Sequence, residues 1–305
     1  KDIIAFFAFV SFFPQLVAGP IERATNLLPQ FYKKRQFNYA NAVDGCRQIL
    51  WGLFKKIVVA DNCALIVNQV FDNYTEYNAS SLLIGSVFFA FQIYGDFSGY
   101  SDIAIGTSRL FGFNLMQNFA FPYFSRDIAE FWRRWHISLS TWFRDYVYIP
   151  LGGSRGGLWM KVRNTFIIFL VSGFWHGANW TFVIWGALNA IYFLPLLLLD
   201  KNRVNTNTVA ENNIVINFKE FIQVGTTFVL TLLAWVFFRA PNVNTAINYI
   251  YNMFSKTIFN FPTIDLKPLI FIFIFLVFEW YNRTKEHGLE INNIKLTIFR
   301  WFIYL

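Results

Sequence analysis

The 305-residue sequence is poor in charged residues. Asp, Glu, Lys and Arg make up only 14% of it, whereas 55% of the residues are hydrophobic. A soluble domain carries roughly 25% charged residues, and the mean hydropathy of this chain is positive, at +0.38. The composition therefore argues against a soluble globular protein and indicates an integral membrane protein, which has the lipid bilayer as its first partner.

Cysteine and histidine are scarce as well. Cys46 and Cys63 form no Cys-x-x-Cys pair, and no histidine lies near them to complete a metal set. The chain has only three histidines, His136, His176 and His287, and they are far apart in the sequence. Because structural and catalytic metal sites need several such ligands at close spacing, no metal site is expected.

Positive charge exceeds negative charge, with a formal net charge of +8. The Lys and Arg residues lie in short clusters between apolar runs rather than along one soluble face. Such clusters orient a protein in the membrane, since cytoplasmic loops are enriched in Lys and Arg. The sequence therefore predicts no nucleic-acid partner.

The apolar runs are long enough to form transmembrane helices, which need roughly 20 apolar residues each. The run at 164–199 is too long for one straight span, and Gly173, Gly177 and Asn179 in its middle predict a break into two segments, with His176 at the break. The stretch 202–217 is Asn-rich and is predicted to be a loop. The runs are 3–19, 48–67, 81–95, 164–199, 221–238 and 266–281.

The distribution of Lys and Arg predicts the topology of the first half. Residues 21–47 and 133–163 are rich in Lys and Arg and are expected in the cytoplasm, whereas residues 68–80 contain neither and are expected outside. The chain starts at Lys1 rather than Met and ends within the apolar stretch Ile298–Leu305. We therefore expect residues 1–305 to form one integral-membrane domain of a protein that continues at both ends.

The stretch Phe131–Tyr148, FWRRWHISLSTWFRDYVY, is predicted to be an amphipathic helix. At 100° per residue one face carries three tryptophans, while the other carries Arg133, His136, Ser140 and Arg144. Such a helix lies at a membrane interface, or its polar face lines a substrate channel. The residues alone leave both interpretations open.

The stretch GFWHGANW at Gly173–Trp180 places an imidazole inside an apolar run. An ionisable group at membrane depth is costly and therefore indicates a functional site. The flanking glycines would let a ligand or another backbone approach His176 closely. The alternative is a neutral histidine that only forms a hydrogen bond to a neighbouring helix.

A third polar stretch is QIYGDFSGYSD at Gln92–Asp102, where Asp96 and Asp102 interrupt an apolar span. Buried carboxylates need partners. We expect Arg133, Arg134 or Arg144 to pair with them, or the carboxylates to line a polar cavity.

These stretches, together with FFPQLVAGPIER at Phe12–Arg23 and RDYVYIPLGGSR at Arg144–Arg155, resemble the membrane-bound O-acyltransferase family. The similarity is greatest to its alginate O-acetyltransferase membrane subunits and to relatives that acetylate peptidoglycan or other exopolysaccharides. The resemblance implies an all-α polytopic membrane protein with re-entrant or broken helices around a central channel. It also implies catalytic roles for His176, in Trp-His-Gly, and for His136, in Arg-Trp-His-x-Ser-Leu-Ser.

On this resemblance we expect transfer of an acetyl group from a cytoplasmic thioester such as acetyl-CoA to hydroxyls of an alginate-like polysaccharide outside the cytoplasm. His176 would take the hydroxyl proton, and the arginines near Arg133 and Arg134 would attract donor phosphates. No bound cofactor is expected, and a periplasmic or extracellular partner acyltransferase and a bacterial cytoplasmic (inner) membrane location are implied. The expected channel-lining residues are Asp96, Tyr100, Arg133, Arg134, Ser140, Arg144 and Asn179.

Other functions stay open at this point. Peptidoglycan and teichoic acid offer hydroxyls as alginate does, and the residues do not separate these acceptors. A proton-coupled transporter or flippase would also place a histidine and carboxylates in the membrane, although the chain has one His-bearing break and no matching second one. A non-catalytic scaffold for a polysaccharide machine is the third class.

Overall fold

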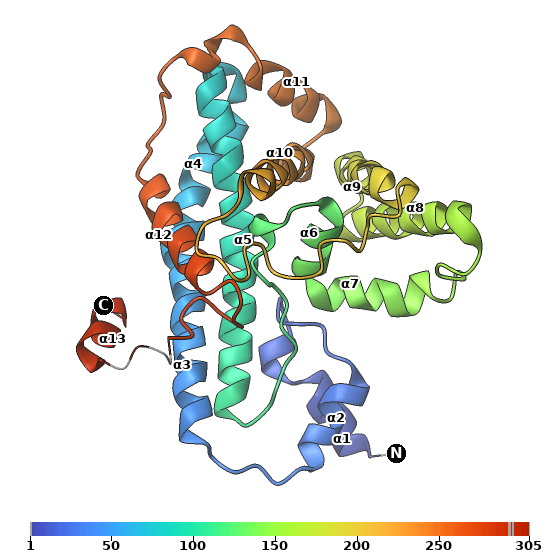
Figure 1. The fold of residues 1–305 in the computed structure, drawn as a ribbon, viewed down its shortest axis with the longest axis vertical. Coiled ribbons are helices and arrows are strands. Elements are labelled where there is room, and N and C mark those ends of the chain that lie inside the picture. Colours follow the sequence, from blue (N-terminus) through green and yellow to red (C-terminus); the bar gives the residue numbers. More distant parts are fainter. Residues whose placement is uncertain (1, 292–293, 295, 305) are drawn as a thin grey trace.

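The computed structural model describes residues 2–291, 294 and 296–304. Lys1 and Leu305, the two ends beyond which the sequence predicts further chain, lie outside the described residues. Every regular element in the described ranges is helical (Figure 1), which confirms the all-α prediction. The α-helices are α1 (Ile3–Val10), α2 (Ala24–Tyr32), α3 (Tyr39–Leu53), α4 (Asp61–Asp72), α5 (Ala79–Leu110), α6 (Ile128–Arg134), α7 (Ile137–Phe143), α8 (Gly157–His176), α9 (Trp180–Leu198), α10 (Phe218–Arg239), α11 (Val243–Met253), α12 (Pro268–Tyr281) and α13 (Thr297–Tyr304).

A long helical hairpin forms the axis of the molecule. Helix α3 continues through a π-helical turn, η2 (Phe54–Ala60), into α4, and this stretch lies antiparallel to α5 (Figure 1). Glycines let the two backbones meet. A Cβ added to Gly99 would lie 2.7 Å from the carbonyl oxygen of Gly52, and one added to Gly106 would lie 2.5 Å from that of Gly45. Close backbone approach at small residues is the usual way in which helices associate in membranes.

This contact gives a stability prediction. Replacing Gly99 with Ala is expected to destabilise the protein by about 1–3 kcal/mol, because the added methyl group must push the two helices apart. Gly225, in α10, is the matched control, since a Cβ there would meet no atom within 4 Å. Gly225→Ala should be neutral or slightly stabilising. Thermal unfolding of both variants in detergent measures the difference, and equal unfolding temperatures would contradict it.

Three helices of the described residues are long and apolar enough to cross a membrane, namely α5, α9 and α10. The predicted run 164–199 is divided between α8 and α9, with the break at Gly177–Asn179, as the glycines indicated. The run 3–19 is different from the expected span, because α1 ends at Val10 and only a short 3-10 turn follows. Pro14 explains this, since a proline has no amide donor and its ring clashes with the carbonyl four residues earlier in an α-helix, here that of Val10.

The Asn-rich loop between α9 and α10, residues 200–217, is an ordered strap that passes over α6 towards α5 (Figure 1). Arginine side chains hold its backbone carbonyls. Arg133 donates to the carbonyls of residues 202 and 205, Arg126 and Arg134 both donate to that of residue 207, and Arg283 donates to those of residues 209, 210 and 213. Because guanidinium groups carry five donors each, four side chains order a long segment that has no secondary structure.

The helices that surround the candidate site come from both halves of the chain. Helices α6 and α7 and the α8–α9 pair lie to one side of α5, and α10 contacts both α5 and α9 (Figure 1). Aromatic rings fill the junction: Trp235 of α10 packs against Trp135 at 5.1 Å and against Trp185 of α9 at 5.8 Å between ring centroids. These helices surround a cavity.

Candidate active site

A cavity of about 790 Å³ lies between α5, α6, α7, α8, α9 and α10. Most of its wall area is aromatic and aliphatic, as in a usual small-molecule site, but nearly half of the lining residues carry a polar or charged group. His136 and His176 both line this cavity, although they are 40 residues apart in the sequence. The fold therefore brings together the two histidines that the sequence analysis singled out.

His176 is the last residue of α8. Glycines allow the sharp return of the chain at this point, because a Cβ on Gly173 would lie 2.3 Å from the carbonyl oxygen of Phe182 in α9. The imidazole packs edge-on against Trp185 and Phe238, at 5.2 and 5.1 Å between centroids. Its ring nitrogens form no hydrogen bond with any described residue, so they are available to a ligand in the cavity.

His136 occupies a break between two short helices. The single helix predicted over 131–148 is wrong: α6 ends at Arg134, His136 has left-handed backbone angles (φ 46°, ψ 54°), and α7 starts at Ile137. The cause is the extended segment around Asn118, whose carbonyl accepts from the Ile137 amide at 2.9 Å. The Asn118 side chain also accepts from the Ser138 hydroxyl at 2.8 Å.

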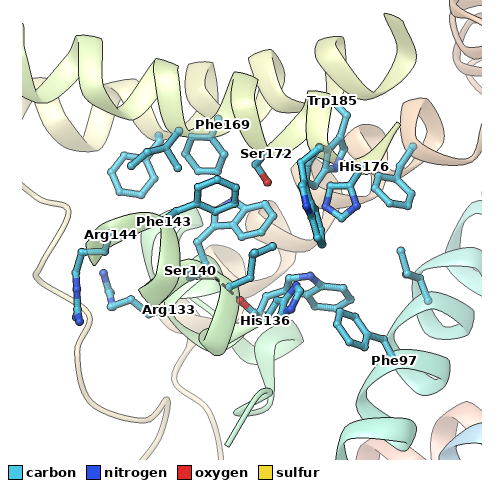
Figure 2. A pocket seen from close by; sticks show the side chains of 18 of the residues that line it. Phe97, Arg133, His136, Ser140, Phe143, Arg144, Phe169, Ser172, His176 and Trp185 are labelled. Atoms are coloured by element: carbon cyan, nitrogen blue, oxygen red, sulfur yellow. Dashed lines mark hydrogen bonds between the residues drawn. The ribbon is translucent and has the colours of Figure 1, made fainter. Parts of the chain in front are cut away.

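The polar face predicted for that stretch nevertheless reaches the cavity. Figure 2 shows Arg133 and Arg144 on one side of the pocket and Phe97 of α5 on the other, with Ser140 between them and both histidines towards the Phe97 side. The kink turns α7 but keeps the four polar side chains on the cavity side. A left-handed non-glycine residue costs of order 1 kcal/mol, so the position of His136 is maintained by its surroundings.

Two residues expected in the wall lie elsewhere. Arg134 donates to Glu130 and to the strap, and it is not among the described residues that line the cavity. Asn179 caps α9 by accepting from the Thr181 amide, and it donates to the carbonyl of Pro241. Both side chains are held by contacts away from the cavity wall, which the sequence did not reveal.

The carboxylates of α5 have lysine partners rather than the arginines expected. Asp102 forms a buried ion pair with Lys55, and Asp96 forms an exposed ion pair with Lys56 at 2.7 Å. Lys55 and Lys56 are adjacent in η2, where a wider π-helical turn lies against α5. Asp96 lines the cavity together with Tyr100, whereas Asp102 does not.

Two further charged side chains, Lys56 and Arg203, line the cavity and were not predicted from the sequence. Lys56 could have been predicted from the sequence. Two consecutive lysines inside the apolar run 48–67 are as costly in a membrane as the carboxylates are, and they therefore indicate a functional site. No sequence pattern indicated Arg203, because its position in the cavity depends on the course of the strap. Arg203 forms no hydrogen bond or ion pair with a described residue.

The arginine side of the cavity keeps a net positive charge. Arg144 donates to Asp145 at 2.8 Å and Arg23 donates to the same carboxylate at 3.2 Å. The hydrogen bond from Arg144, supported by that from Arg23, lowers the pKa of Asp145 below its ordinary value. Arg133 donates to the strap carbonyls, whereas Arg144 uses only its Nε on Asp145, so Arg144 and Arg203 both keep open guanidinium donors at this side.

The site has the groups that acyl transfer needs. An imidazole with open nitrogens can take a proton from a hydroxyl, and aromatic walls keep water away from a reactive acyl group. The described residues contain no group of three His, Cys, Asp or Glu side chains that could hold a metal ion.

Residues 1–235 match the family model described as MBOAT, membrane-bound O-acyltransferase family. The chain is 38% identical, over 97% of its length, to a probable alginate O-acetylase of Pseudomonas aeruginosa, of which it covers 51%. It is 42% identical over 80% of its length to a peptidoglycan O-acetyltransferase of Helicobacter pylori, of which it covers 45%. A teichoic acid D-alanyltransferase of Bacillus subtilis is 31% identical over 60% of the chain, which covers 49% of that relative.

The chain thus spans about half the length of the curated relatives that it matches. The family match covers the helices that contribute both histidines, and the similarity to the Pseudomonas relative extends over nearly the whole chain. The chain belongs to the membrane-bound O-acyltransferase family.

Proposed function

We propose that the protein containing this chain transfers an acetyl group from a thioester donor to a hydroxyl of a polysaccharide outside the cytoplasm, with His176 as the general base. The observation that carries the proposal is the imidazole of His176, which has no hydrogen-bond partner among the described residues and faces an aromatic cavity. A histidine titrates in the range that general base catalysis requires.

In the proposed reaction the acceptor oxygen attacks the thioester carbonyl as His176 removes the hydroxyl proton. A carbon–oxygen bond forms, the carbon–sulfur bond breaks, and the proton leaves with the thiolate as the free thiol. His136, on the same cavity, is the second proposed catalytic residue. Acetyl-CoA is the proposed donor, and the open guanidinium of Arg203 would contact its phosphates, with Arg144 beside it.

The relatives support the proposed acceptor, and the partner and the location are proposed from the family resemblance. Alginate or a similar exopolysaccharide is the proposed acceptor, because a probable alginate O-acetylase is similar to nearly the whole chain. Peptidoglycan is the second candidate acceptor, since the sequence identity to the Helicobacter peptidoglycan O-acetyltransferase is comparable to that of the Pseudomonas relative. We place residues 1–305 as one membrane domain in the cytoplasmic membrane of a bacterium and propose a partner acyltransferase outside the cytoplasm that completes the transfer.

The test compares cells that lack the gene with cells complemented by the full-length gene. Ester-linked acetyl groups are measured separately in the exopolysaccharide and in the peptidoglycan. We expect the ester to appear in the exopolysaccharide only when the gene is present. Appearance in the peptidoglycan would move the assignment to the second acceptor, and no difference in either fraction would refute acyl transfer.

A further inference from the structure

Asp96 and Tyr100 form a polar group on the α5 side of the cavity. They are four residues apart on one helix and therefore lie on the same face, and both line the cavity. The Asp96 side chain is 56% exposed, although it lies in the middle of a 32-residue membrane helix. The Tyr100 hydroxyl forms no hydrogen bond with a described residue. Both polar groups are therefore accessible to a ligand in the cavity.

Lys56 fixes the carboxylate. Its ammonium group contacts Asp96 at 2.7 Å and Asp61 at 2.8 Å, so one positive charge is shared between two negative ones. The group as a whole keeps one negative charge. Asp96 therefore has lone pairs left for a hydrogen-bond donor, so the group favours sugar hydroxyls, and any carboxylate on the same sugar would have to point away from it. Asp61 has the same partner but does not line the cavity.

A second observation points to a polar ligand next to this group. His136 is only 6% exposed, its ring nitrogens have no partner in the described ranges, and it lines the same cavity. Its ring lies edge-on against Phe97, at 4.6 Å between centroids, and Phe97 follows Asp96 in the sequence. Because buried polar groups are normally hydrogen-bonded, the imidazole is expected to meet a polar ligand beside Asp96.

The chemistry of the group selects the ligand. A sugar offers hydroxyl donors to the carboxylate, an oxygen to accept from the tyrosine, and an apolar C–H face to the phenyl ring. We propose that Asp96 and Tyr100, held by Lys56, bind hydroxyls of the sugar acceptor at the α5 side of the cavity. This inference rests on the proposed acyl transfer and assigns the acceptor to the side opposite Arg133, Arg144 and Arg203.

The experiment compares Asp96→Asn with Asp61→Asn. Each variant removes one carboxylate charge from Lys56, and the two side chains are similarly exposed, at 56% and 50%. Only Asp96 reaches the cavity. Full-length protein in lipid nanodiscs is titrated with a mannuronate hexamer and, separately, with a chitin hexamer. We expect Asp96→Asn and Tyr100→Phe to weaken binding by about tenfold, as for loss of a hydrogen bond to a charged group, and Asp61→Asn to change it less than twofold.

Two results would overturn the proposal. One is an equal loss of binding in the Asp96 and Asp61 variants, which would mean that the carboxylates act only through Lys56. The other is a wild-type protein that binds neither sugar. The acetyl ester measurement is separate: cells with the gene that gain ester, combined with unchanged binding in Asp96→Asn, would refute this subsite and leave the proposed acyl transfer intact.

Discussion

Replacing His176 with Ala is expected to reduce acyl transfer by about 10²–10⁴-fold, the usual contribution of a general base. The imidazole forms no hydrogen bond with a described residue, so its removal leaves no buried polar partner unsatisfied. It is surrounded by rings of α9 and α10, and the lost volume merges with the cavity already present. The fold should therefore persist while the chemistry stops.

The measurement is the ester-linked acetyl content of surface polysaccharide in cells that carry the full-length protein, with membrane levels matched by immunoblot. His136→Ala is measured in parallel and is also expected to reduce the ester. His287 supplies the control, because it is buried and bound to Asp44 but does not line the cavity. Per molecule of membrane protein, His287→Gln should keep its activity. Normal ester content in the His176 variant would exclude the proposed base and favour transport or a scaffold role.

The sequence predicted the residue types of the candidate site better than its geometry. The break at His176 was predictable because glycines interrupt an apolar run that is too long for one helix. The break at His136 was not, because the 131–148 stretch contains neither Gly nor Pro. The backbone carbonyl of Asn118, in a separate loop, accepts a hydrogen bond from the amide of Ile137. A tertiary contact of this kind overrides the local helical pattern.

The ion-pair partners of the charged side chains could not be predicted from the sequence either. Arg133, Arg134 or Arg144 were expected to pair with the carboxylates, yet the hairpin places Lys55 and Lys56 of η2 against α5. Arg133 and Arg134 instead hold the strap, and Arg144 pairs with Asp145. Which of several cations reaches a given carboxylate depends on helix packing, and the spacing of residues along one helix does not report it.

Glu130 is the centre of that strap contact, and its loss should have the largest effect on stability. Its side chain is 2% exposed and lies between two arginines, accepting from Arg126 at 3.0 Å and from Arg134 at 3.0 Å. Glu130→Ala removes the charge that compensates both guanidinium groups. Breaking a buried pair by removing one partner costs about 3–5 kcal/mol.

The expected result for Glu130→Ala is a large fall in unfolding temperature, measured on detergent-solubilised full-length protein, together with faster proteolysis within residues 200–217. Glu220→Ala is the comparison, because Glu220 contacts the same Arg126 at 3.1 Å from a more exposed position and should cost much less. Arg126 and Arg134 both donate to the carbonyl of residue 207, so loss of Glu130 frees the strap as well as the ion pairs. The strap carries Arg203 to the cavity, so weaker binding of a phosphate-bearing donor should accompany the instability. A stable variant with an intact strap would mean that the carbonyl contacts alone hold the two arginines in place.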